Sequence, residues 1–117
     1  MFYRTLRQGG AVGLLPDQAP GAGEGVWANF FGRPAYTMTL AVRLQRATGA
    51  AVIMVFAERL SEGRGYHLHF EDLPTAQLDE AALNRAVEIQ VRRRPEQYLW
   101  SYNRYKIPAG AEPPPEF

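Results

Sequence analysis

A continuous apolar run at residues 49–57 is the feature that most constrains the fold of this 117-residue chain. Its centre, residues 50–56, is rich in β-branched side chains, which favour strands. The run is too short to span a bilayer, and a strand without polar alternation is typical of a sheet covered on both faces. The sequence therefore predicts a central buried strand, closed by Glu58 and Arg59.

A second strand is predicted at residues 66–70, after a glycine-containing turn at residues 61–65. Apolar and polar residues alternate there, so Tyr66, Leu68 and Phe70 share one face of the strand. Because the connection is short, we expect an antiparallel hairpin with the preceding strand.

The two histidines of the chain, His67 and His69, share the other face of this strand. Histidines spaced in this way are able to bind a metal. The nearest acids in the sequence, Glu71 and Asp72, are weak candidates for a third ligand. We therefore expect a solvated sheet face and no metal site.

An α/β fold is indicated by the segments on either side of the apolar run. Residues 11–15 are a short apolar run and predict a buried strand, and residues 16–33 predict a long loop. Residues 34–48 predict a helix, with a proline in its first turn and Gly49 just after its end. Strand, crossover helix and strand would form a βαβ unit with parallel strands.

This predicted unit suggests a ligand site. Open α/β sheets bind ligands at the carboxyl ends of their strands, and helix N-termini favour anions. We therefore expect Asp17, Gln18 and Arg33 to border a site. The alternative is that these residues only form turns and caps, which use the same residue types.

The C-terminal part predicts a helix at residues 78–94, a short helix from Pro95 to Trp100, and a flexible proline-rich tail at residues 108–117. Cations and aromatics are interleaved here, which suits a membrane interface or an anionic-lipid surface. The alternative is that the aromatics pack inward and the cations are solvated. The predicted membrane or anion patch comprises Arg92, Arg93, Arg94, Trp100, Arg104 and Lys106.

Composition excludes several function classes. There is no cysteine, so neither a disulfide framework nor a thiolate nucleophile is present. The net charge is only +1, which argues against a nucleic-acid partner. The glycines at 21, 23 and 25 lack the spacing of a dinucleotide-binding motif. We expect no cofactor.

Four blocks of sequence, in this order, resemble the C-terminal half of the late acyltransferases of lipid A biosynthesis. They are residues 14–18 (LLPDQ), 26–37 (VWANFFGRPAYT), 48–52 (TGAAV) and 95–106 (PEQYLWSYNRYK). The resemblance covers roughly residues 3–107 and includes the lauroyl and myristoyl transferases. It implies part of the three-layer fold of the glycerolipid acyltransferases, with the βαβ unit, the hairpin strand and C-terminal helices.

The resemblance also implies an activity, which is transfer of a fatty acyl chain from acyl carrier protein to a lipid A precursor. It implies work at the cytoplasmic face of the bacterial inner membrane, to which this chain would bind peripherally. By position, the substrate-binding residues would be Asp17, Gln18, Arg33, Thr37 and Arg59.

The same resemblance places the family's catalytic histidine and acidic residue upstream of the matched blocks. We therefore expect no catalytic residue in this chain, and we expect residues 1–107 to be the C-terminal part of an acyltransferase domain that is inactive alone. Its partner would be the missing N-terminal half. The alternative function is that of a stand-alone, non-catalytic α/β module that binds an anionic lipid or phosphate.

Overall fold

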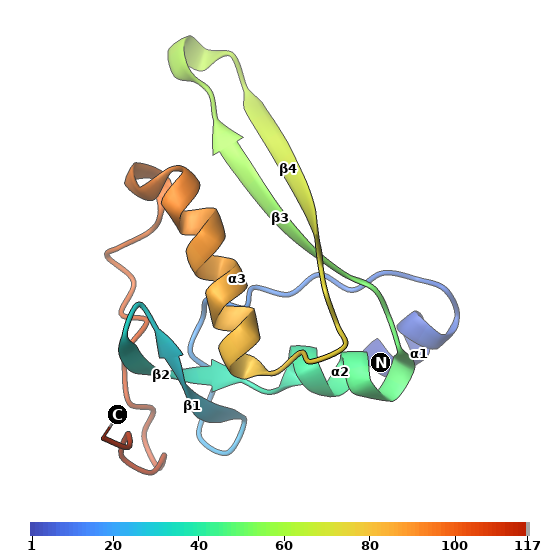
Figure 1. Cartoon of the computed structure of the whole chain (residues 1–117), viewed down its shortest axis with the longest axis vertical. Helices are drawn as coiled ribbons and strands as arrows, with labels where there is room; N and C mark the ends of the chain where they lie inside the picture. The colour runs from blue at the N-terminus through green and yellow to red at the C-terminus, as the bar shows by residue number, and fades with distance from the viewer. Residues whose placement is uncertain (117) are drawn as a thin grey trace.

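The structure, a computed structural model, describes residues 1–116 and consists of two β-hairpins and three helices (Figure 1). The strands are β1 (Gly25–Phe30), β2 (Arg33–Met38), β3 (Val52–Arg59) and β4 (Tyr66–Leu73). The helices are α1 (Phe2–Arg7), α2 (Leu40–Thr48) and α3 (Glu80–Arg93), with 3-10 turns η1 (Ser61–Gly63) and η2 (Pro95–Gln97). The α/β class, the C-terminal helix and the antiparallel pairing of β3 with β4 are confirmed.

The predicted βαβ unit is wrong for the part of the chain that the structure describes. Each sheet has two strands, and both pairs are antiparallel. Residues 11–15 form no strand, and the Leu15 side chain is 63% exposed rather than buried. In residues 1–116 β3 is hydrogen-bonded to β4 and not to residues 11–15, so residues 11–15 have no strand partner.

The helix predicted at residues 34–48 begins only at Leu40, because the residues before it form β2. Phe31 and Gly32 both have positive φ, 49° and 78°, and they link Phe30 to its register partner Arg33. Positive φ at both central residues is what the turn of a two-residue hairpin requires. The turn chemistry therefore makes a hairpin where the sequence suggested the start of a helix.

The hydrophobic core lies between α3 and the β1–β2 hairpin. Its buried residues are Phe30, Ala35, Val87 and Val91, and Met54 of β3 packs against them. Asp79 caps α3, because its carboxylate accepts a hydrogen bond of 2.7 Å from the backbone N–H of Ala82. This core fixes the position of α3 and so of the residues at its C-terminal end.

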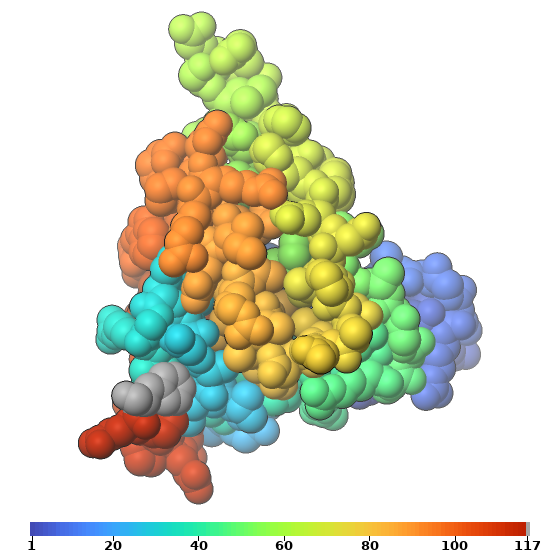
Figure 2. Space-filling view, viewed as in Figure 1, coloured from blue at the N-terminus to red at the C-terminus, as the bar shows by residue number. Residues whose placement is uncertain are grey.

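The β3–β4 hairpin projects from this core (Figures 1 and 2). The alternating burial along β3 shows that one of its faces is covered and the other is open. On the open face of the hairpin, Ile53, Val55, Leu68 and Phe70 are between 51% and 66% exposed. The expectation of a strand covered on both faces is therefore wrong for residues 1–116. The projecting hairpin also raises the radius of gyration to 15.2 Å, above the roughly 13 Å of a compact domain of this length.

The C-terminal tail lies against β1 where the structure describes it. The indole N–H of Trp27 donates a hydrogen bond of 3.1 Å to the backbone carbonyl of Glu112. Phe117, the last residue of the predicted flexible tail, lies outside the described residues. No helix among the described residues is both long enough and apolar enough to cross a membrane.

Candidate functional site

An apolar cleft of about 710 Å³ lies between residues 12–17, β3 and α3. Its walls are mostly aliphatic, and its volume falls in the range of typical small-molecule sites. Asp17, Arg94, Gln97 and Tyr98 are among the lining residues that supply polar atoms. A cleft of this chemistry is suited to a hydrocarbon chain that carries a polar group.

Asp17 borders this cleft, as the sequence predicted for a ligand site, but it follows an irregular segment rather than a strand. The negative charge of Asp17 affects the pKa values of Tyr98 and Arg104. The pKa of Tyr98 is raised, first by burial and then by the charge of Asp17. Burial lowers the pKa of Arg104, and nearby negative charge including that of Asp17 opposes this shift.

Arg104 is an internal residue and not part of a surface patch, because only 3% of it is exposed. Its guanidinium donates to the carbonyl of Tyr36 at 2.6 Å, to Oγ1 of Thr37 at 3.0 Å and to Oδ1 of Asn84 at 3.3 Å. It also lies over the ring of Phe30. The side chain therefore ties the C-terminal segment to β2 and α3.

Thr37 is wholly buried in the same network. Its hydroxyl donates to the carbonyl of Ala35 at 2.9 Å and accepts from Asn84 at 2.8 Å and from Arg104. Such a hydroxyl has its hydrogen-bonding capacity used inside the protein. Thr37, predicted to bind substrate, is thus placed in the interior.

The other predicted substrate residues do not converge on one point. Arg33 is exposed at the start of β2, and its guanidinium stacks on the ring of Tyr105 at 4.1 Å. Gln18 is exposed in the irregular segment after residue 17. Arg59 is exposed at the end of β3, where its backbone exchanges two hydrogen bonds of 2.8 and 2.9 Å with the side chain of Gln97. Because Gln97 lines the cleft, Arg59 lies beside the cleft. Arg33 lies on the β1–β2 hairpin.

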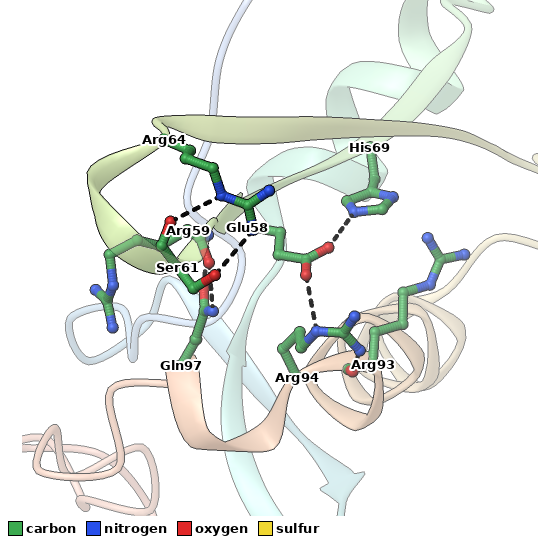
Figure 3. Close-up of polar contacts among 8 residues, drawn as sticks. All are labelled: Glu58, Arg59, Ser61, Arg64, His69, Arg93, Arg94 and Gln97. Atoms are coloured by element: carbon green, nitrogen blue, oxygen red, sulfur yellow. Dashed lines mark hydrogen bonds and ion pairs between the residues drawn. The ribbon is translucent and has the colours of Figure 1, made fainter.

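A polar cluster joins the β3–β4 hairpin to the C-terminal end of α3 (Figure 3). Glu58 is at its centre, with Oε1 at 2.9 Å from Nε2 of His69 and Oε2 accepting from Nε of Arg94 at 2.8 Å. The hydrogen bond from His69 is the main reason that the pKa of Glu58 is lowered, and Arg94 adds to the effect against desolvation. Glu58 was not predicted from the sequence as a site residue, because only the register of the hairpin reveals its neighbours.

The arginine run at the end of α3 carries less free charge than its sequence suggested. Arg92 pairs with Glu88 at 3.3 Å, Arg93 with Glu71 at 2.7 Å, and Arg94 with Glu58. Figure 2 shows this end of the helix on the surface next to the hairpin. The exposed members of the predicted patch are these arginines together with Trp100 and Lys106, whereas Arg104 is excluded by burial.

β4 contains a histidine and an acid that lie five positions apart, His67 and Asp72. Their side chains lie on opposite faces of the strand, because the number of residues between them is even. Asp72 is in register with Ile53 on the open face, whereas His67 is in register with Glu58. The two groups are therefore not placed to act as a catalytic pair.

The family model for bacterial lipid A biosynthesis acyltransferases matches residues 1–107. This chain belongs to that family. It is similar to the lipid A biosynthesis palmitoleoyltransferase of Escherichia coli K12, with 36% identity over 113 residues, which is 91% of this chain and 37% of the relative. It is also 30% identical to the lauroyltransferase of that strain, over 90% of this chain and 37% of the relative.

The myristoyltransferase of the same strain is 32% identical over 85% of this chain and 32% of its own length. The predicted family is confirmed. The chain spans about a third of the length of the curated relatives that it matches.

Proposed function

We propose that this chain forms the C-terminal part of an enzyme that transfers a fatty acyl chain to a lipid A precursor. The observation that carries the proposal is the apolar cleft between residues 12–17, β3 and α3, found in a chain of the lipid A acyltransferase family. The cleft would hold the hydrocarbon part of the acyl group, whose burial from water drives binding at roughly 0.8 kcal/mol per methylene. The polar residues at its margin would lie near the reacting end.

The acceptor of such an enzyme carries phosphate groups, which arginine binds with two parallel hydrogen bonds. Arg59 is suited to this role, because its backbone is held by Gln97 beside the cleft and its side chain is exposed. Arg33 is the second candidate, at the turn of the β1–β2 hairpin. The acyl donor would be a thioester of acyl carrier protein.

The catalytic histidine and acid would be supplied by the N-terminal part of the whole enzyme, upstream of the region that this chain matches. The chain alone would then be inactive. The open face of the β3–β4 hairpin, with Val55 and Phe70 exposed, supports the idea that further protein covers it in the whole enzyme.

The site of action would be the cytoplasmic face of the inner membrane. Leu99, Trp100 and Ile107 are between 55% and 69% exposed, and Lys106 lies among them in sequence. Exposed aliphatic and indole groups beside a cation suit the interface of an anionic bilayer. Nucleic acid is not an expected partner.

A hybrid enzyme tests the proposed activity. The matching C-terminal third of the E. coli palmitoleoyltransferase is replaced by this chain, and transfer from acyl carrier protein thioesters to a lipid A precursor is measured. We expect turnover by the hybrid and none by the isolated chain. Ala51→Trp, which fills the cleft from its wall, should lower kcat/KM for long acyl chains at least tenfold and spare short ones.

Ala76→Trp is the matched control, because Ala76 is exposed and lies outside the cleft lining. An inactive hybrid that folds like the parent enzyme would refute the proposal. So would equal chain-length profiles for the two tryptophan variants.

A further inference from the structure

The face of the β3–β4 hairpin that turns toward α3 carries two imidazoles and a carboxylate close together. His67 and His69 are neighbours on this face of β4, with ring centroids 4.1 Å apart. Glu58 is the register partner of His67 on β3. One ligand atom from each of these residues lies within 4.8 Å of the other two.

We propose that Glu58, His67 and His69 bind a divalent transition-metal ion, with Zn²⁺ as the ion best suited to the site. Two imidazoles and one carboxylate form a donor set that Zn²⁺ accepts, and three protein ligands leave its fourth position open for water or an anionic oxygen. Imidazole ligands disfavour Mg²⁺ and Ca²⁺, which prefer oxygen.

The geometry needs only a small side-chain adjustment to reach coordination. Bonds of about 2.0–2.1 Å to a tetrahedral Zn²⁺ place two ligand atoms roughly 3.4 Å apart. Nε2 of His69 and Oε1 of Glu58 are already 2.9 Å apart. His67 is exposed, so its ring is able to rotate at χ1 and χ2 without disturbing the core. The strands themselves do not have to move.

Arg94 supports the site as well as opposing it. It donates to Oε2 of Glu58 and so leaves Oε1 for the metal. The positive charge of Arg94 reduces the affinity of the site for a cation. The neighbouring Arg93 adds less to this effect, because its charge is paired with Glu71. We therefore expect binding in the micromolar range rather than the tight binding of a buried structural site.

The proposal is tested on the chain itself, after removal of metal with a chelator. Calorimetric titration with Zn²⁺ should give one ion per chain, and Co²⁺ should give the visible absorption of a four-coordinate ion. At a hundredfold excess over Kd, Zn²⁺ should raise the melting temperature by roughly 10 °C. His67→Ala, which removes an exposed side chain, should weaken binding at least tenfold without unfolding the protein.

His69→Ala and Glu58→Gln should each weaken binding as well. Glu62→Gln removes the same charge from the exposed hairpin turn and should bind Zn²⁺ like the unchanged chain. The proposal is overturned if no binding is seen up to millimolar Zn²⁺, or if His67→Ala binds Zn²⁺ as tightly as the Glu62→Gln control. Because metal is measured directly on the chain, neither result depends on acyl transfer.

Discussion

Removing the guanidinium of Arg104 tests whether this residue is an internal clamp or a surface cation. In Arg104→Ala, the buried acceptors on Tyr36 and Asn84 lose their donor, and Oγ1 of Thr37 then accepts only the hydrogen bond from Asn84. An orphaned buried group costs about 1–3 kcal/mol, although groups that share one partner do not add fully. Loss of this side chain, whose guanidinium lies over the ring of Phe30, leaves a cavity as well.

Together these losses should lower the free energy of unfolding by about 3–5 kcal/mol, the usual cost of breaking a buried charged network. Proteins of this size are stable by about 5–15 kcal/mol, so much of the total would be lost. Arg104→Lys keeps the charge and fewer of the donors. We therefore expect a smaller loss, of about 1.5–3 kcal/mol.

Urea unfolding followed by the fluorescence of Trp27 and Trp100 measures these differences. Arg85→Ala is the matched control, because this arginine is exposed on the surface of α3. It should cost no more than about 0.5 kcal/mol. The reasoning is refuted if Arg104→Ala costs less than about 1 kcal/mol, the value expected of a surface cation.

Three further predictions follow from the structure. Burial is the main reason that the pKa values of Tyr98 and Tyr105 are raised above 10. The unfolded chain therefore loses these two protons at a lower pH than the folded chain, and stability should fall as the pH rises above 10. Urea midpoints measured against pH should show a shallower fall for Tyr98→Phe. Asp79→Ala removes the N-cap of α3 and should cost about 1 kcal/mol in the same assay, whereas an unchanged midpoint would show that the cap contributes nothing. In the hybrid enzyme, Arg59→Gln should lower kcat/KM for the acceptor about ten- to hundredfold at an unchanged melting temperature, because losing a charge-assisted hydrogen bond costs about 1.5–3 kcal/mol. A lowered melting temperature with unchanged kinetics would instead show that Arg59 has a structural role.

Local chemistry was sufficient to predict the C-terminal helix, the glycine at the end of α2 and the β3–β4 hairpin. Helical periodicity and capping lie within a few residues of one another, and α3 indeed ends just before Pro95. Gly49 has φ 68° at the helix end, where the left-handed conformation favours glycine. Alternation in residues 66–70 is likewise a local signal.

The β1–β2 hairpin and the buried network could not be predicted in the same way. The sequence around Gly32 and Pro34 is typical of a helix start, and the signal for a hairpin is a positive φ at Phe31, which phenylalanine rarely adopts. The contacts of Arg104 with Tyr36 and Thr37 span 68 and 67 residues, respectively. Nothing in a linear pattern distinguishes this buried arginine from its exposed neighbours.

The arginines of this chain illustrate why composition alone does not locate an anion site. Twelve of its thirteen basic residues are arginine, a bias that suits phosphate as well as internal acceptors. Several of the guanidinium groups donate hydrogen bonds to acceptors of the protein itself. Arg46 donates to the carbonyl of Leu78, and Arg64 donates to Ser61. A guanidinium that already satisfies a protein acceptor would have to give up that bond to bind a phosphate.

Arg59 differs from Arg46 and Arg64 because its backbone, rather than its guanidinium, makes the hydrogen bonds to the rest of the protein. Its backbone, not its side chain, is held by the amide of Gln97, so the position of the residue is fixed while its guanidinium stays exposed. Gln97 and Arg94 line the apolar cleft, and Arg94 also contacts Glu58, the residue before Arg59. An anion bound by Arg59 would therefore lie near the polar margin of the cleft, whereas one bound by Arg33 would lie at the turn of the other hairpin. This placement makes Arg59 the better candidate for the acceptor phosphate.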